Sequence, residues 1–253
     1  MTADRPARRG LVGPTIAAVC AFALLIALGT WQVKRLAWKE ALIATVSARF
    51  AAPPSPLPPS SDWARLNPDS NEYQRVSFTG EFLNDKEALV FTTGSSMRGE
   101  SGPGYWVFTP ARFSGGAVMV NRGFVPDGRQ NPATRAQGEI AGPVQIVGIM
   151  RWPERAGMFT PGAEPAKNLW FSRDSTAIAA AKGIGPVAPF YVEQEAPPAP
   201  GGLPHVGALK PSFPNNHLGY AFTWYGLAAV LAGVFGTWFV GRWRARGEAS
   251  PQT

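Results

Sequence analysis

The 253-residue chain has few of the side chains that most often carry chemistry in proteins. It contains one cysteine, Cys20, and two histidines, His205 and His217. A single cysteine excludes an intramolecular disulfide, and we expect Cys20, inside an apolar stretch, to be a small buried residue. The motifs GxSxG, HExxH, CxxC, the P-loop and a GxGxxG after a strand are all absent. No motif therefore assembles a nucleophile, a base or a metal, and we predict that the protein is not an enzyme.

Charge is missing from two long stretches. Apart from Cys20, no ionisable side chain lies in Gly10–Val33, and His217 is the only group titrating near neutral pH in Pro211–Gly241. A bilayer core of about 30 Å needs about 20 helical residues, so we predict two transmembrane helices. The first stretch has an alternative, a cleaved signal peptide with arginines before it and a cleavage site near Gly29, but its apolar run is longer than usual for one.

The positive charge gathers at the two ends of the chain. Residues 34–210 carry 18 Lys and Arg against 15 Asp and Glu. Arginines precede the first stretch and follow the second, at positions 5, 8, 9, 242, 244 and 246. The positive-inside rule then places both termini in the cytoplasm or the mitochondrial matrix, and the middle segment across the membrane. These arginines explain much of the basic pI, and no nucleic-acid motif is visible, so no nucleic-acid partner is expected.

The fold class predicted is a membrane protein of α+β type, in which two transmembrane helices flank a β-rich extramembrane domain. Its parts are a cytoplasmic N-terminus (1–10), transmembrane helix 1 (11–33), a membrane-proximal helix with a proline-rich linker (34–60), the β-rich domain (61–210), transmembrane helix 2 (217–240) and a cytoplasmic tail (241–253).

Alternation of apolar and polar residues predicts the strands of the middle segment. The segments expected are Gln74–Phe82, Ala88–Thr93, Gly104–Phe113, Gly116–Val125, Val144–Arg151 and a short Phe190–Gln194. One helix is expected at Ser175–Ala181, with Asp174 or Ser175 as its N-cap.

His217 is the most informative titratable residue. Helical geometry puts it on one face with Tyr220, Ala221 and Trp224 at the start of the second apolar stretch. Trp31 is expected at about the same depth at the end of the first stretch. An apolar site with one imidazole and flat rings suits haem iron, which takes an axial histidine.

The same residues have a structural interpretation. An interfacial histidine can sit at headgroup level and cap the helix together with Asn215 and Asn216. The aromatic residues then form an ordinary interfacial belt. Sequence leaves both interpretations of His217 open.

Two features of the middle segment also have alternatives. Arg122-Gly123 is expected either to form a turn or to expose an arginine for a carboxylate partner. Gly80, inside a strand pattern, indicates a bulge or a close backbone approach.

Five motifs, in order, resemble the SURF1 (Surfeit-1) family. Gly29–Lys39 is similar to its G-x-W-Q-x-x-R-x-x-W-K, and Gly80-Glu81-Phe82 to its G-x-F element. Gly104–Pro110 matches G-Y-x-V-x-T-P, while Val120–Pro126 resembles V-N-R-G-W-V-P with Phe124 in place of tryptophan. His217-Leu218, Tyr220 and Thr223-Trp224-Tyr225 match N-x-H-L-x-Y-x-x-T-W-Y.

This resemblance implies an assembly factor for haem–copper (cytochrome c) oxidase in the bacterial or mitochondrial inner membrane. It implies binding of haem a, with His217 as axial ligand and Trp224, Tyr220 and Trp31 beside it, and delivery to oxidase subunit I. Haem a synthase and the lipid bilayer are further expected partners. The alternative is a cofactor-free scaffold that stabilises subunit I, and a membrane-anchored enzyme is a third hypothesis.

Overall fold

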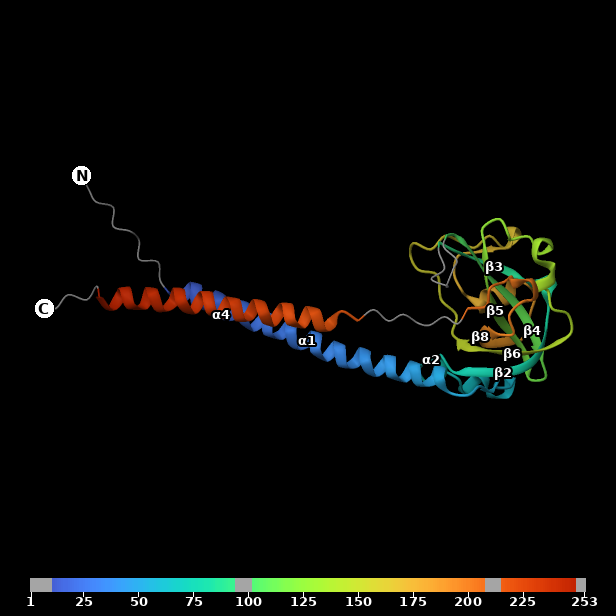
Figure 1. The fold of residues 1–253 in the computed structure, drawn as a ribbon, viewed down its shortest axis with the longest axis horizontal. Coiled ribbons are helices and arrows are strands. Elements are labelled where there is room, and N and C mark those ends of the chain that lie inside the picture. Colours follow the sequence, from blue (N-terminus) through green and yellow to red (C-terminus); the bar gives the residue numbers. More distant parts are fainter. Residues whose placement is uncertain (1–10, 94–101, 208–214, 249–253) are drawn as a thin grey trace. The chain divides into compact units, whose positions relative to one another are not determined.

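The computed structural model describes residues 11–93, 102–207 and 215–248 (Figure 1). The chain divides into two compact units. One comprises residues 1–45 and 212–253 and is helical, and the other comprises residues 46–211 and holds all the strands.

The helical unit consists of two long apolar helices, α1 (Val12–Ala51) and α4 (His217–Glu248). Both are long and apolar enough to cross a membrane. Helix α1 has 40 residues and runs unbroken through the predicted first span and its extension, and its last residues from Val46 belong to the second unit. The expectation that Cys20 is buried was wrong, because its side chain is exposed on the surface of α1; in a two-helix unit most of each helix surface has no protein neighbour.

The second unit is built on a closed β-barrel. Its sheet consists of β1 (Ser55–Pro56), β2 (Arg75–Phe82), β3 (Ala88–Thr92), β4 (Gly104–Phe113), β5 (Gly116–Pro126), β6 (Pro143–Arg151), β7 (Leu169–Trp170) and β8 (Val187–Ala196). Strands β2, β6, β8, β5 and β4 are neighbours in that order, and β4 pairs back onto β2 through Phe82 and Ala111. Only the β5–β8 pair is parallel within this ring. Closure leaves the five ring strands without a free edge.

Two apolar clusters lie on opposite sides of the barrel wall. Alternate residues of β2 point inward, so that Phe78 and Phe82 meet Ile146 of β6 and Phe190 of β8. The other cluster contains Trp106, Phe108 and Tyr191, and helix α3 (Ser175–Ala181) covers it with Ile178. The cap of α3 is Asp174, whose side chain accepts a hydrogen bond from the backbone amide of Ala177.

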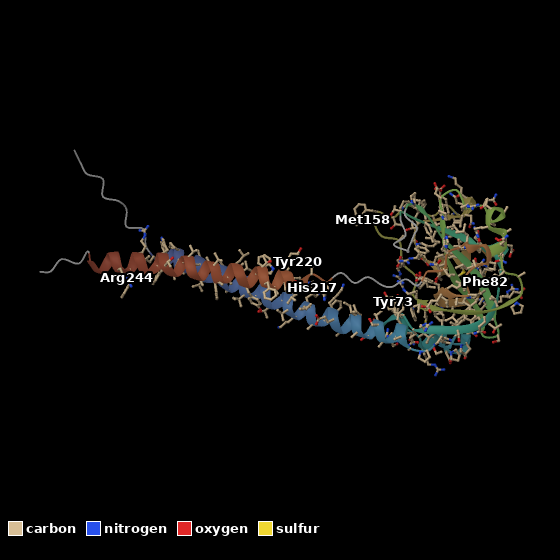
Figure 2. All side chains as sticks on the ribbon, viewed as in Figure 1. Tyr73, Phe82, Met158, His217, Tyr220 and Arg244 are labelled. Carbon is tan, nitrogen blue, oxygen red and sulfur yellow. The ribbon has the colours of Figure 1, made fainter. Side chains whose placement is uncertain are left out.

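Most of the expected strands form, and the departures arise from pairing between distant segments. Strand β8 has ten residues instead of five because β5 and β6 flank it on both sides. The proline-rich linker contains the short strand β1, which pairs with β2. Four-residue α2 (Pro68–Asn71) and five 3-10 segments make up the remaining helical turns, namely Ser60–Arg65, Asn84–Lys86, Pro132–Gly138, Pro165–Lys167 and Pro200–Gly202. Between β6 and β7, Met158 and Phe159 are exposed at a loop (Figure 2).

Candidate functional site

His217 opens helix α4 (Figure 2). A side chain of helix α1 contacts its ring. Its Nδ1 lies 2.8 Å from the Oε1 of Gln32. With the Gln32 amide oxygen facing the ring, Nδ1 is the donor of this bond, and in a neutral imidazole Nε2 is then the nitrogen with the lone pair. Gln32 is 8% exposed, although it is a polar residue at the end of an apolar stretch. His217 therefore faces the other helix of the unit, and its ring orientation is set by that helix.

A close approach of the two helices makes this contact possible. Gly29 lies against the ring of Tyr225, and a Cβ at Gly29 would meet ring atoms at 2.7 Å. The Thr30 hydroxyl and the Tyr225 hydroxyl are 3.1 Å apart and share a hydrogen bond. Ala221 and Ala228 of α4 are buried in the same unit. Small residues let helices approach closely, and the polar pairs then join them.

The other predicted cofactor-binding residues are placed less tightly. Tyr220 and Trp31 are each 56% exposed, and Trp224 is half-buried. Within the described segments none of them is hydrogen-bonded to His217. The predicted face of α4 therefore divides: Ala221 is buried and His217 is half-buried, while Tyr220 is exposed and offers a flat ring at the surface of the unit.

Asn215, two residues before the helix, carries an unusual buried atom. Its Oδ1 is inaccessible to solvent and has no hydrogen-bond partner among the residues that the structure describes. The first-turn bond at this end runs instead from the Tyr220 amide to the backbone oxygen of Asn216. The expected capping by Asn215 is thus not seen within the described segments, and an unpaired acceptor lies two residues before His217 in the chain. Buried acceptors of this kind are normally satisfied by water or a ligand.

Sequence reasoning missed Gln32 and Tyr225 as members of this site. The available signal for Gln32 was a lone amide near the end of a charge-free stretch, at the predicted depth of His217. Tyr225 lay within the aromatic belt and in the T-W-Y motif, and neither predicted its contact with helix α1. Its role depends on the glycine opposite it, 196 positions earlier in the chain.

In the barrel, Arg122 is not available for an outside partner. It is 1% exposed within β5, so both expectations for Arg122-Gly123, a turn or an exposed arginine, were wrong. Its guanidinium donates to the Gly138 carbonyl and to Asn84 Oδ1, and it lies over the Phe82 ring at 4.4 Å. Burial lowers the pKa of Arg122 to about 10, while the negative charge of Glu87 acts in the other direction and raises it. Arg122 is a buried structural cation that joins β5 to the 3-10 segments 84–86 and 132–138.

Gly80 makes a close approach and no bulge. The β2–β6 register runs without a shift through it, and a Cβ there would lie 2.9 Å from the Phe78 ring and 3.1 Å from the Arg112 carbonyl oxygen.

A second polar cluster lies on the barrel around Glu193. Arg151 donates to Glu193 Oε2 at 3.4 Å and to Glu72 Oε1 at 3.1 Å, and it lies over the Tyr73 ring at 4.9 Å. Asn121 Nδ2 is 3.5 Å from the other carboxylate oxygen. Burial raises the pKa of Glu193 to about 7, although Arg151 and Arg173 oppose the shift. This cluster links β5, β6 and β8 to the turn that follows α2.

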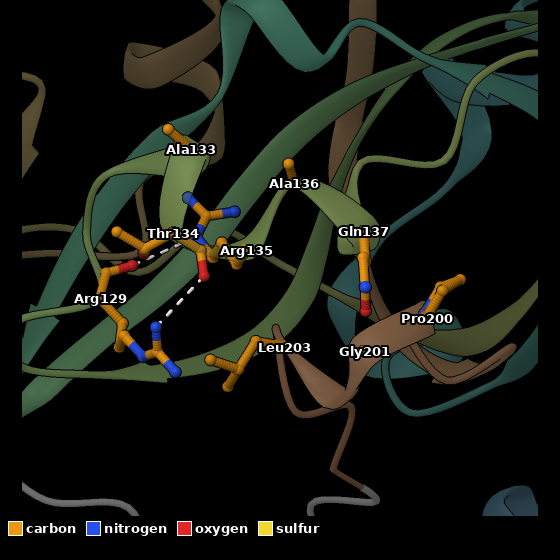
Figure 3. A pocket seen from close by; sticks show the side chains of 9 residues that line it. All are labelled: Arg129, Ala133, Thr134, Arg135, Ala136, Gln137, Pro200, Gly201 and Leu203. Atoms are coloured by element: carbon orange, nitrogen blue, oxygen red, sulfur yellow. Dashed lines mark hydrogen bonds between the residues drawn. The ribbon is translucent and has the colours of Figure 1, made fainter.

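A shallow pocket of about 380 Å³ lies beside the 3-10 segment 132–138 (Figure 3). Arg129 on its rim donates to the Thr134 carbonyl at 3.2 Å. The guanidinium of Arg135 is occupied by a bidentate ion pair with the buried Glu87. Gln137 and Leu203 complete the lining together with backbone and small side chains. The pocket therefore offers a ligand one cationic side chain, Arg129, which already makes one hydrogen bond to the backbone.

No group of three His, Cys, Asp or Glu side chains converges on a metal-sized position among the described residues. The helix pair at His217 is therefore the strongest candidate site, because it combines an oriented imidazole, a buried orphan acceptor and nearby aromatic rings.

Comparisons with known proteins all point to one family. The sequence model of the SURF1 family matches residues 19–229. A SURF1-like protein of Monosiga brevicollis is 37% identical over 212 residues, covering 80% of this chain and 78% of that protein. Surfeit locus protein 1 of Rattus norvegicus is 36% identical over 229 residues, covering 85% and 72% of the two chains. The Homo sapiens protein of the same name is 36% identical over 218 residues, covering 81% and 70%.

Proposed function

Because the chain belongs to the SURF1 family, we propose that it is a membrane-anchored assembly factor for haem–copper oxidase. It binds haem a through His217 and helps this cofactor reach oxidase subunit I. The observation that carries the proposal is the contact of His217 Nδ1 with Gln32 Oε1. In a neutral imidazole that donates from Nδ1, Nε2 is the nitrogen that can bind iron.

The residues at this site fit a haem. The macrocycle supplies four ring nitrogens to its iron, so that one protein imidazole suffices as an axial ligand. Tyr220, Trp224 and Trp31 offer flat aromatic surface at the same end of the helix pair. The orphaned Asn215 Oδ1 can accept a hydrogen bond from a hydroxyl-bearing ligand. His217 would hold the iron, the exposed aromatic rings would offer flat surface to the macrocycle, and the helix pair would keep the ligand within the membrane.

We place the chain in the bacterial inner membrane, or the mitochondrial inner membrane of a eukaryote. Two long apolar helices support a two-span topology. The arginines before residue 10 and after residue 241 favour a cytoplasmic or matrix location for both termini. The barrel unit then lies on the opposite side, where it can contact an oxidase subunit.

The role is proposed to be non-catalytic, with haem a as cargo. Subunit I is the expected acceptor, and haem a synthase is the expected donor. Transfer requires a site that both holds and releases its ligand. A single axial histidine at the open end of a two-helix unit meets that need better than an enclosed pocket does.

A cofactor-free scaffold is the second candidate, and one observation favours it. The Gln32–His217 hydrogen bond also joins α1 to α4, which by itself gives His217 a structural purpose. In this alternative the helix pair and the barrel stabilise subunit I during assembly without carrying haem.

The test is to co-express the full chain with the haem a synthesis enzymes, purify it in detergent and record its visible spectrum. The same preparation is made for His217→Ala and, as a matched control, for His205→Ala, the only other histidine. We expect a haem a band near one equivalent in the wild type and in His205→Ala, and its loss in His217→Ala.

A colourless wild-type protein that still supports oxidase assembly in cells would overturn the carrier proposal and favour the scaffold. A band that persists in His217→Ala would move the ligand to another residue.

A further inference from the structure

We infer that Gln32 is the positioning residue of the His217 site. Its amide oxygen selects the Nδ1–H tautomer of the imidazole and directs Nε2 as the coordinating nitrogen. The tautomer is a property of the protein alone, while the consequence for iron rests on the proposed haem function.

The geometry of the contact supports this role. The two atoms are 2.8 Å apart, which is a short distance for an N–H···O bond. Gln32 is almost fully buried, so water does not compete well for its oxygen. In surroundings of low dielectric such a bond is strengthened, and breaking it would leave a buried acceptor unsatisfied. Glutamine stays uncharged, so it orients the ring without adding a buried anion to the helix pair.

Neighbouring contacts join the same two helices without touching the imidazole. Gly29 and Thr30, in the preceding turn of α1, contact Tyr225 two turns into α4. Two interhelical hydrogen bonds therefore lie on one seam, Thr30–Tyr225 and Gln32–His217. The first of them does not touch the imidazole, so the two functions of the seam, pairing the helices and orienting the ring, can be separated by mutation.

Such a partner matters to a metal ligand. Histidine ligands usually donate their second ring N–H to an acceptor, which fixes the tautomer and raises the basicity of the coordinating nitrogen. Loss of that acceptor typically costs about 10–100-fold in metal affinity. Gln32 is in the position to supply it for His217.

The first experiment needs no haem. The full chain, labelled with ¹⁵N-histidine and held in detergent, contains only two imidazoles, and His217→Ala assigns them. We expect His217 Nδ1 to give a protonated signal and Nε2 an unprotonated one. Gln32→Leu should abolish this preference, whereas Thr30→Val, which removes the other interhelical bond, should retain it. An unchanged tautomer in Gln32→Leu would overturn the inference.

The second experiment titrates the same proteins with haem a and records affinity and midpoint potential. We expect binding about 10–100-fold weaker in Gln32→Leu and near wild type in Thr30→Val. Gln32→Glu, which keeps an acceptor and strengthens it, should lower the potential. A merely structural role would weaken binding equally in Gln32→Leu and Thr30→Val, and that result would overturn the inference.

The two experiments distinguish a failure of the proposed carrier function from a failure of the positioning role of Gln32. If the tautomer depends on Gln32 but the wild type binds no haem a, the proposed carrier function fails and the positioning of His217 stands. If haem a binds through His217 with no dependence on Gln32, the carrier function stands and the positioning role fails.

Discussion

Gly29 lies directly against the ring of Tyr225, and this contact sets how closely α1 and α4 pack. A Cβ at Gly29 would come within 2.7 Å of the ring, closer than real Cβ contacts allow. The contact lies within one turn of Gln32, so the spacing it sets also brings the Gln32 amide within reach of His217.

Substitution of Gly29 should therefore loosen the helix pair. We expect Gly29→Val to push Tyr225 away and to cost about 1–3 kcal/mol, as overpacking does. Thermal unfolding of the detergent-solubilised chain measures the loss, and the ¹⁵N signals of His217 report whether its bond to Gln32 survives. Gly13→Val on the same helix is the control, since nothing lies within 4 Å of its added Cβ. Equal losses of thermal stability in the two variants would contradict the close packing of Gly29 against Tyr225.

The buried Glu193 should make the barrel unit pH-sensitive. Its folded pKa, about 7, lies above the usual value of 4.5. The folded state then binds the proton more tightly than the unfolded state does. Its contribution to stability is full below about pH 4.5 and is lost as the pH rises through about 7, by about 3 kcal/mol in total.

Glu193→Gln should remove this pH dependence and keep a polar partner for Asn121. The measurement is the free energy of unfolding between pH 5 and pH 8.5, followed by tryptophan fluorescence. Glu81→Gln, at an exposed position of β2, is the matched control and should leave the wild-type slope in place. A slope that is the same in Glu193→Gln and the wild type would show that another group is responsible.

The Glu87–Arg135 pair should be costly to break from one side. Both side chains are almost fully buried and their contact is bidentate. Glu87→Gln or Arg135→Met alone leaves an uncompensated buried charge, and we expect a loss of roughly 3–5 kcal/mol. The double variant Glu87→Gln/Arg135→Met should be less destabilised than the sum of the two single variants. Additive losses in denaturant unfolding would count against a coupled buried pair.

Gly123 should tolerate no side chain. Its φ is +118°, and an added Cβ would lie 2.0 Å from the His205 carbonyl oxygen, which accepts a hydrogen bond from the Phe124 amide. We expect Gly123→Ala to break the bridge between Phe124 and His205 and to lower the unfolding temperature strongly. Gly128→Ala has a positive φ of +84° but open space around its Cβ. It should show only backbone strain, of order 1–3 kcal/mol, and a comparable loss in both variants would argue against the clash.

Local patterns predicted most of the secondary structure correctly. Strands β2 to β6 follow from alternation of apolar and polar residues, and α3 follows from its Asp174 cap. Strand β8 was predicted too short, because its ends are stabilised by neighbouring strands and carry only a weak signal of their own. Strands β1 and β7 have two residues each, and they exist only through pairing with β2 and β3.

The contacts around His217 were predicted less completely than the fold. His217 was evident from its position as the titratable group of an apolar stretch. Its partner was not, because Gln32 lies 185 positions away and the contact depends on the rotation of one helix about the other. Arg122 was misjudged for a related reason. A charged residue between a strand and a glycine usually lies at the surface, but closure of the barrel put this one inside.

The sequence by itself determined the features that depend on composition along the chain. Two charge-free stretches long enough to span a bilayer and a middle segment of alternating strands follow from residues that are near each other in the sequence. Only the tertiary structure decided that β4 closes onto β2, that Arg122 is buried, and that Gln32 contacts the His217 ring. These features join residues far apart in the chain, and their geometry is set by strand register and helix packing, which local composition does not encode.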